Sequence, residues 1–116
     1  MSCIDVFVCA VADAKRERYA KRARDNAAIF KQHGAEQVIE CWGVETPPGK
    51  KTSFPQAVQL AEGETVVTGM VIWPSVDKRN EAMPKAMAAI NSAGGSTDLL
   101  DGSRLIFGRF EEIVKA

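Results

Sequence analysis

The feature of this sequence that most limits its fold is a pair of predicted strands that are apolar on both faces. Successive side chains of a strand point to opposite sides of the sheet, so a strand with one solvent-exposed face alternates apolar and polar residues. Residues 3–11 and 64–73 do not alternate in this way. The opposing sets are Phe7, Cys9 and Val11 against Ile4, Val6 and Val8, and Val67, Val71 and Trp73 against Val66, Met70 and Ile72. Both faces of the sheet therefore need cover.

The order of the predicted elements indicates an α+β protein. Strands are expected at 3–11, 36–43, 64–73 and 104–114, and helices at about 13–33, at 54–61 (a minor one) and from residue 76. Two β-α-β halves predict a ferredoxin-like βαββαβ sandwich, as a single domain over residues 1–116. Right-handed crossovers place the antiparallel strands in the order 4-1-3-2, with the two doubly apolar strands in the centre.

Capping residues mark the expected helix ends. Asp13 is a suitable N-cap for the first helix, and Gly34 fits the left-handed position after its last turn. Ser53 and Gln56 have the spacing of a capping box before the minor helix. Ser75 is expected to cap the last helix.

The doubly apolar strands predict a homodimer. Two principal helices cover one face of a four-stranded sheet, and little of the chain is left for the other face. A second copy packed sheet to sheet covers that face and gains about 25 cal/mol for each Å² of apolar surface removed from water. The interface is then expected to be isologous. The alternative is that the minor helix at 54–61 folds over the second face.

Composition narrows the classes of function. Fifteen basic residues balance fifteen acidic ones, so net charge favours neither nucleic acid nor an anionic membrane as a partner. The apolar run at 3–11 is too short to cross a bilayer and lacks the basic flank and cleavage site of a secretory signal. Three cysteines are too few for a disulfide scaffold. We therefore expect a cytoplasmic protein.

A series of short motifs runs along the chain in a fixed order. They are Asp5-Val6-Phe7-Val8, Glu40-Cys41-Trp42-Gly43, Pro48-Gly49-Lys50 before Phe54, Glu62-Gly63-Glu64-Thr65-Val66-Val67, Trp73-Pro74-Ser75 with Arg79, Asp101-Gly102-Ser103-Arg104, and Gly108 with Phe110-Glu111. The series resembles the YbaA-like bacterial family, a small domain of unknown function placed among the dimeric α/β barrels. The resemblance covers about residues 2–113, with Glu-Cys-Trp-Gly and Asp-Gly-x-Arg as its most specific motifs. It implies a ferredoxin-like monomer that pairs into a barrel, and no particular reaction.

Two segments depart from the family pattern. Residues 96–100 stand where a loop with methionine, proline and phenylalanine is typical of the family. Pro84 falls inside an expected continuous helix; since proline lacks an amide donor, it is expected to kink the helix or to start a new one. Both departures concern the shape near the end of the second principal helix.

Five side chains are candidates for a ligand site. Glu40 and Trp42 share one face of an edge strand, Asp5 lies on a central strand, and Arg109 lies on the opposite edge strand. A carboxylate beside an indole in a half-closed cavity can have a raised pKa and act as a base, although an ion pair and a packed tryptophan are the favoured interpretation. His33, the single histidine, is expected to relieve unpaired carbonyls at a helix end; a catalytic base is the less favoured alternative.

Metal, thiol and nucleotide chemistry receive little support. A lone histidine does not make a histidine-rich metal site, and no cofactor is expected. Cys3, Cys9 and Cys41 lack the C-x-x-C spacing and are expected to be small buried hydrophobes, although a thiol cluster is conceivable. The segment 49–52 resembles a phosphate loop only superficially, because five residues separate Gly43 from Gly49 and a second lysine follows the first.

Two classes of function remain. The first is a small-molecule-binding module with an apolar cavity between sheet and helices; a cofactor-independent oxygenase- or isomerase-like enzyme is its catalytic variant, by analogy with the fold. The second is a noncatalytic interaction or stress-related accessory protein that uses the basic first helix and the loop at 92–102. A solvated basic face is favoured over RNA or lipid binding for that helix. Binding of a small molecule is preferred, and the question of enzymatic activity stays open.

Overall fold

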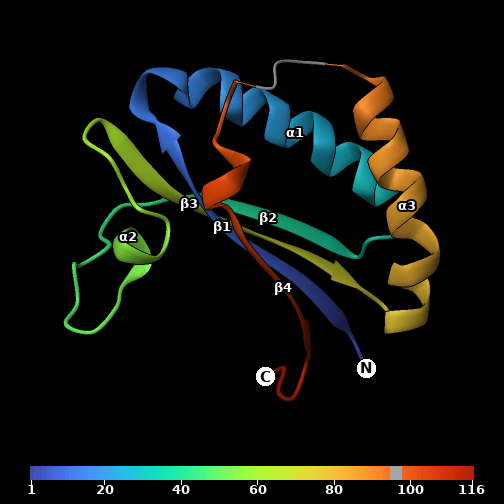
Figure 1. Ribbon diagram of the computed structural model, residues 1–116. Helices are drawn as coiled ribbons and strands as arrows, with labels where there is room; N and C mark the ends of the chain where they lie inside the picture. The colour runs from blue at the N-terminus through green and yellow to red at the C-terminus, as the bar shows by residue number, and fades with distance from the viewer. Residues whose placement is uncertain (95–97) are drawn as a thin grey trace.

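A computed structural model describes residues 1–94 and 98–116, and its elements follow the expected βαββαβ order (Figure 1). The strands are β1 (Cys3–Ala12), β2 (Gln37–Trp42), β3 (Glu64–Trp73) and β4 (Ile106–Glu111). The helices are α1 (Arg16–Gln32), α2 (Phe54–Ala57) and α3 (Val76–Ser92), with 3-10 turns η1 (Asp13–Lys15) and η2 (Gly102–Arg104). The α+β class is thereby confirmed.

The four strands form one antiparallel sheet in the order β2-β3-β1-β4, which reads β4-β1-β3-β2 from the other edge. In the register, Asp5 lies between Val71 of β3 and Arg109 of β4, and Glu40 of β2 lies opposite Gly69 of β3. The doubly apolar strands β1 and β3 are the central pair. This register brings the odd-numbered residues of β1 and β3 to the face that carries α1 and α3.

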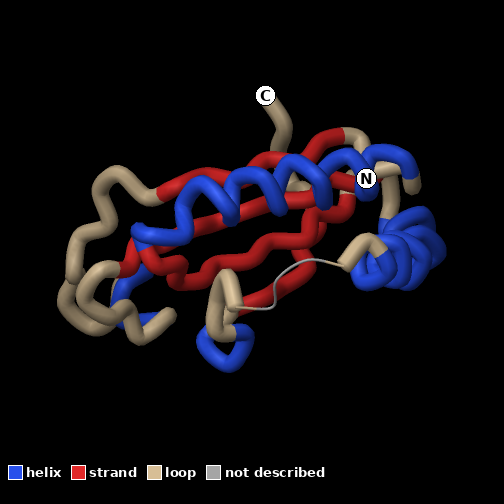
Figure 2. Tube along the Cα trace, turned by 90° about the horizontal axis from the view of Figure 1, so that it is seen from above, coloured by secondary structure: helices blue, strands red, loops and turns tan. Residues whose placement is uncertain are grey.

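The two long helices cover the sheet unevenly. Figure 2 shows α1 running along the strands, whereas α3 is seen nearly along its axis at one end of the sheet. The helices therefore cross at a steep angle instead of lying side by side, and they diverge over the middle of the sheet.

The core on the helix side consists of two clusters. One joins Cys3 and Trp73 to Ala82 of α3, and the ring of Phe30 meets the Trp73 indole edge to face at 6.2 Å. The other joins Cys9 and Val67 to Tyr19 of α1. Burial of these side chains fixes both helices to the sheet.

The opposite face of the sheet is only partly covered. The segment that contains α2 places Val58 against Ala10 and Val66, all three of them buried. Elsewhere on this face large apolar side chains remain open to solvent: Ile39 is 37%, Met70 36%, Ile106 42% and Phe110 57% exposed. The minor helix therefore covers one end of the second face and leaves the rest of it open.

Several predicted ends differ from those observed. Asp13 does not cap α1: its carboxylate accepts a 2.5 Å hydrogen bond from the Thr65 hydroxyl, and the chain passes through η1 before the helix starts. The minor helix ends at residue 57, because Gln59 adopts a left-handed conformation with φ of 51°. The last strand begins at residue 106, because the chain around Arg104 forms η2 instead.

Other predicted caps are confirmed. The hydroxyls of Ser53 and Ser75 accept hydrogen bonds from the amides three residues later, at 3.1 and 3.0 Å. The Gln56 side chain does not complete a capping box, since it donates to the carbonyl of Pro48. Gly34 has φ of +107°, as its position after α1 requires. The helix α3 runs through Pro84 as one element, so no new helix starts there.

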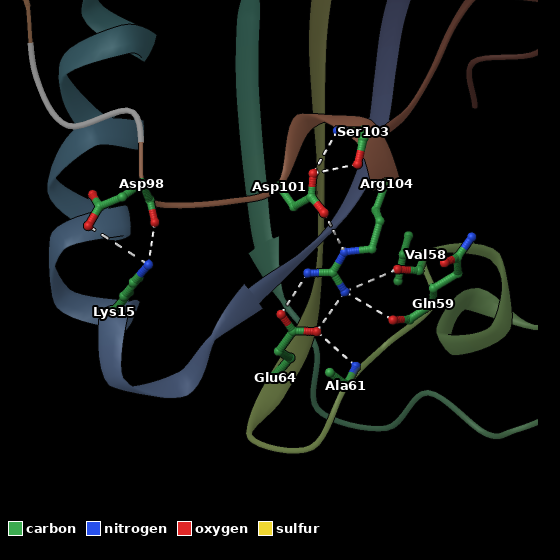
Figure 3. A network of polar contacts seen from close by, with 9 residues as sticks. All are labelled: Lys15, Val58, Gln59, Ala61, Glu64, Asp98, Asp101, Ser103 and Arg104. Atoms are coloured by element: carbon green, nitrogen blue, oxygen red, sulfur yellow. Dashed lines mark hydrogen bonds and ion pairs between the residues drawn. The ribbon is translucent and has the colours of Figure 1, made fainter.

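A network around Arg104 ties η2 to the start of β3 and to the end of the α2 segment (Figure 3). Its guanidinium makes two hydrogen bonds of 2.8 Å to the Glu64 carboxylate, and donates to the carbonyl of Gln59 and to Asp101. The Arg104 guanidinium and the amide of Ala61 hold the pKa of Glu64 at about 2. The Asp-Gly-x-Arg motif therefore has a structural role here.

Candidate functional site

A partly enclosed cavity lies between α1, α3 and the helix side of the sheet. Two adjoining lobes of about 310 and 460 Å³ share Phe7, Phe30, Glu40 and Met87 in their walls. Most of the lining is apolar, with Asp5 and Arg79 at one lobe and Tyr19 and Arg22 at the other. An apolar cavity with a few convergent polar groups has the character of a small-molecule site. We call it the central cavity.

Glu40 is the acidic group on which the cavity converges. It stands on β2, where the strand alternation turns its side chain toward α1, and its Oε1 accepts a 2.6 Å hydrogen bond from the Tyr19 hydroxyl. Burial raises the pKa of Glu40, while the Tyr19 hydrogen bond acts in the opposite direction. Burial also raises the pKa of Tyr19, and the neighbouring Glu40 adds to this shift. The pair is therefore a neutral phenol that donates to a carboxyl group whose proton affinity is increased.

The floor of the cavity is made possible by a glycine. A Cβ atom on Gly69 would lie 2.3 Å from Cε1 of Phe7 and 3.0 Å from Cγ of Glu40. The first contact is too short for any side chain at this position unless the Phe7 ring moves, and the second is tighter than an ordinary van der Waals contact. The missing side chain therefore lets the Phe7 ring cross from β1 over β3 and lie beside Glu40.

Asp5 is buried and fully engaged within the protein. Only 3% exposed, it accepts a 3.0 Å hydrogen bond from the Trp73 indole N–H and pairs with the Arg79 guanidinium at 3.1 Å. The Asp5–Trp73–Arg79 cluster joins β1, β3 and α3 at the end of the cavity. Both carboxylate oxygens of Asp5 accept hydrogen bonds within this cluster, so the main contribution of Asp5 to the site is to hold Arg79 in the wall of the central cavity.

His33 and Arg109 lie outside the central cavity. The His33 ring is at the C-terminal end of α1, where Nδ1 lies 2.9 Å from the carbonyl oxygen of Ile29. Arg109 lies opposite Asp5 in the register and donates to the side chain of Asn80 at 2.9 Å. The structure thus brings Asp5 and Glu40 to one cavity and places these two candidates elsewhere.

Trp42 occupies a second concavity, at the edge of the sheet. Its indole lies on the helix side of β2, with the guanidinium carbon of Arg16 5.0 Å from the ring centroid. This groove between α1 and β2 has a volume of about 340 Å³, and Tyr19 and Glu40 line it as well as the central cavity. The Tyr19–Glu40 pair therefore lies where the two spaces meet. We call this second space the edge groove.

The cysteines do not form a cluster. Cys3 and Cys9 are buried on the helix side, whereas Cys41 is exposed and its register position places it on the opposite face of the sheet. Burial raises the pKa of the Cys9 thiol to about 11. Within residues 1–94 and 98–116, no three potential ligand side chains gather at a point that could hold a metal ion, and no helix is long and apolar enough to cross a membrane.

Two important residues of the site were not singled out from the sequence. Tyr19 stands among the basic residues of the first helix, and its position two turns before Ala27, on an alanine-rich stripe, is a signal of burial. Arg79 was noticed only as part of a family motif. The pairing of each with a carboxylate on a distant strand depends on helix packing, which no local pattern reveals.

Comparison with known proteins gives the family. The family model described as a protein of unknown function, DUF1428, matches residues 2–97. The chain belongs to the DUF1428 family. The uncharacterized protein YbaA of Escherichia coli K12 is similar to it, with 37% identity over 98% of both chains, and YbaA of Shigella flexneri matches equally well. The expected resemblance to YbaA-like proteins is confirmed.

A solved structure supports the fold of this DUF1428 protein. A mutant of SnoaB, described as a cofactor-independent oxygenase from Streptomyces nogalater, aligns over 98% of this chain and 95% of its own with a TM-score of 0.58. Sequence identity between the two is 14%, so the likeness concerns the fold alone.

The family motifs have different roles in the structure. Glu-Cys-Trp-Gly directs Glu40 and Trp42 to the helix side of the sheet, next to the cavity and the groove. Asp-Gly-x-Arg builds the Arg104 network far from Glu40 in the chain. Within the segment 96–100, which departs from the family pattern, residues 96 and 97 lie outside the described residues. Leu99 of the same segment is buried in the core.

Proposed function

We propose that this protein binds a small, mainly apolar molecule in the central cavity, and that Glu40 recognises a hydrogen-bond donor on it. The observation that carries the proposal is the state of the Glu40 carboxyl. Oε1 is held by Tyr19, while Oε2 receives no hydrogen bond from the described residues. A half-buried carboxyl group with one oxygen still open to a donor, at the meeting point of two apolar lobes, favours a ligand with an apolar body and one O–H or N–H group.

The proposal includes a homodimer that packs sheet against sheet. It is supported by the open apolar part of the second face, where Ile39, Met70, Ile106 and Phe110 leave a third or more of their surface in water. Large exposed apolar patches mark interaction sites, and a second copy supplies a matching face by symmetry. The resulting dimeric α/β barrel leaves the central cavity of each protomer on the outer, helix-covered side.

Ligand binding is tested by thermal shift and calorimetry with a matched pair of probes, 4-propylphenol and propylbenzene. We expect the phenol to bind more tightly, and the difference to shrink in Glu40→Gln because a neutral amide replaces the carboxyl acceptor. A ligand at 100 times its Kd adds about 2.7 kcal/mol of stability, so the shift is measurable. Glu36→Gln, at an exposed position, is the control. Equal binding of both probes by the unmodified protein contradicts the role of Glu40.

The dimer is tested by sedimentation at micromolar concentration. We expect Ile39→Glu and Met70→Glu to produce monomers, because each places a charge on the interface. Val76→Glu is a matched control, since Val76 is 40% exposed and Ile39 37%, but Val76 begins α3 away from this face. A monomeric unmodified protein, or a dimer that survives both substitutions, contradicts the sheet-to-sheet arrangement.

A second candidate function is proton abstraction from the bound molecule. The raised pKa of Glu40 favours this candidate, and so does the fold shared with SnoaB, which is described as a cofactor-independent oxygenase. A half-buried carboxylate of increased proton affinity is suited to act as a base. The test is hydrogen–deuterium exchange at acidic C–H groups of cyclic β-diketones, followed by NMR. Exchange that is unaffected by Glu40→Gln excludes this role.

Partner binding through the basic helix receives less support. Arg18 donates to the carboxylate of Asp98 at 2.8 Å, and Arg22 donates to the carbonyl of Gly94 at 2.9 Å. These bonds tie α1 to the segment after α3. The part of the 92–102 loop formed by residues 95–97 lies outside the described residues. Unchanged copurifying partners in Arg18→Glu and Arg22→Glu would argue against this alternative.

A further inference from the structure

The edge groove shares Tyr19, Ala23, Val38 and Glu40 with the central cavity, and the rest of its lining is its own. On one side lies a stripe of small residues on α1, and on the other lies the strand β2, mainly with its helix-facing side chains. The lining comprises Arg16, Tyr19, Ala20, Ala23, Arg24, Ala27, Val38, Glu40, Cys41, Trp42 and Val67. The three alanines leave room that longer side chains would fill, so the groove has an apolar bottom with charged groups at its margin.

The basic residues of α1 separate into two groups by their partners. Four of them bond within the chain: Arg18 to Asp98, Lys21 to Asp25, Arg22 to the carbonyl of Gly94 and Lys31 to the carbonyl of Glu36. For Arg16 and Arg24, no hydrogen bond or ion pair to another described residue exists. These two arginines are the ones that line the edge groove. Two cations that have no anionic partner among residues 1–94 and 98–116 therefore converge on this space.

The Arg16 guanidinium is held in a defined position. Its central carbon lies 5.0 Å from the centroid of the Trp42 ring, within the range of a cation–π contact. A guanidinium stacked on an aromatic face keeps its N–H groups in its own plane, where they remain available to a carboxylate. The indole therefore orients the arginine without using its donors.

The remaining acid in the groove does not neutralise the two cations. Glu40 is the single acidic side chain of the lining, and its Oε1 is already occupied by the Tyr19 hydroxyl. Even with Glu40 ionised, Arg16 and Arg24 leave the lining with an excess of one positive charge. Charge complementarity thus favours an anionic occupant, and the alanine and valine surface favours an apolar body.

We propose that the edge groove binds a small carboxylate with a flat apolar body. The carboxylate bonds to the in-plane N–H groups of Arg16, and the body lies along Ala20, Ala23 and Ala27 toward Val38. Arg24, eight residues from Arg16 and so about 12 Å further along the helix axis, adds electrostatic attraction without a direct bond. This site adjoins the central cavity at the Tyr19–Glu40 pair, and it lies on the helix side, so a sheet-to-sheet dimer leaves it open.

The proposal is tested by calorimetry with 2-naphthoate and its neutral counterpart 2-naphthylmethanol, together with the indole N–H signals of the two tryptophans in a ¹⁵N-labelled sample. We expect 2-naphthoate to bind and to move the Trp42 signal, while the signal of the fully buried Trp73 stays in place. The Trp42→Phe variant assigns the two signals. The alcohol is expected to bind at least about tenfold more weakly, as the loss of a charge-assisted hydrogen bond implies.

Substitutions on the same helix separate the site from general charge effects. Arg16→Gln is expected to raise the Kd for 2-naphthoate about tenfold or more, and Arg24→Gln by less than about fivefold, the range of a solvent-exposed charge. Lys21→Gln removes the same charge from α1 outside the edge groove and is expected to leave the Kd unchanged. Each of three results overturns the proposal: absence of 2-naphthoate binding, equal binding of the alcohol, or an equal loss in Lys21→Gln and Arg16→Gln. The outcome is independent of the Glu40 test with 4-propylphenol.

Discussion

Substitution of Asp5 by alanine tests the cluster that joins β1, β3 and α3. The carboxylate accepts the N–H of the fully buried Trp73 indole and pairs with Arg79, whose side chain is 17% exposed. A buried donor without an acceptor costs about 1–3 kcal/mol, and breaking a buried ion pair costs about 3–5 kcal/mol. Because water still reaches part of Arg79, we expect a combined loss of about 3–4 kcal/mol in the free energy of unfolding.

The assay is urea denaturation followed by tryptophan fluorescence at one fixed protein concentration. Asp5→Asn keeps an oxygen for Trp73 but removes the charge, so we expect it to lose about half as much as Asp5→Ala. The double variant Asp5→Ala/Arg79→Ala is expected to be less unstable than the sum of the single variants, because no unpaired cation remains. Glu36→Ala, at an exposed position, should change stability by less than about 0.5 kcal/mol.

The result that refutes this reasoning is a loss of less than about 1 kcal/mol in Asp5→Ala. Such a result means that Asp5 does not hold the structure together and is available to a ligand, which is the role that the sequence pattern left open. Additive effects in the double variant would equally contradict a coupled pair.

Three further outcomes are expected. The pKa of Glu64 is about 2 in the folded protein against 4.5 ordinarily, so its contribution to stability is present above pH 4.5 and is lost as the pH falls toward 2; acid titration of Glu64→Gln should lack this loss. Ser75→Ala removes the N-cap of α3 and should cost about 1 kcal/mol in urea denaturation. With a pKa raised to about 11 and no exposed surface, the thiol of Cys9 should resist a disulfide reagent at pH 8 until the protein unfolds, and rapid modification would contradict its burial.

The strands and their faces were predictable because they depend on local alternation. The two-sided apolar pattern of residues 64–73 identified a central strand, and the structure places β3 beside β1 in the middle of the sheet. The caps at Ser53 and Ser75 were found from short-range spacing alone. Asp13 failed as a cap because a distant partner, the Thr65 hydroxyl, binds its carboxylate.

The site was only half predictable, because strand alternation is a local pattern whereas the partners of these side chains are distant in the sequence. The alternation of β2 was enough to place Glu40 and Trp42 on one face, and the parity of β1 was enough to place Asp5. The partners Tyr19, Arg79 and Arg16 approach from helices whose crossing angle depends on the whole packing of the sheet, and Gly69 matters only because Phe7 crosses it. Side-chain pairs of this kind arise from tertiary geometry.

The position of β1 between β3 and β4 has a consequence for how the protein is made. Cys3 pairs with Glu111, so β1 leaves the ribosome long before β4, the strand that pairs with its outer edge. Pairing over so many residues forms late and slowly. During synthesis the apolar strand β1 therefore has one edge with unpaired backbone groups. Nascent chains of this protein should depend on chaperones more than those of a helical bundle of the same length.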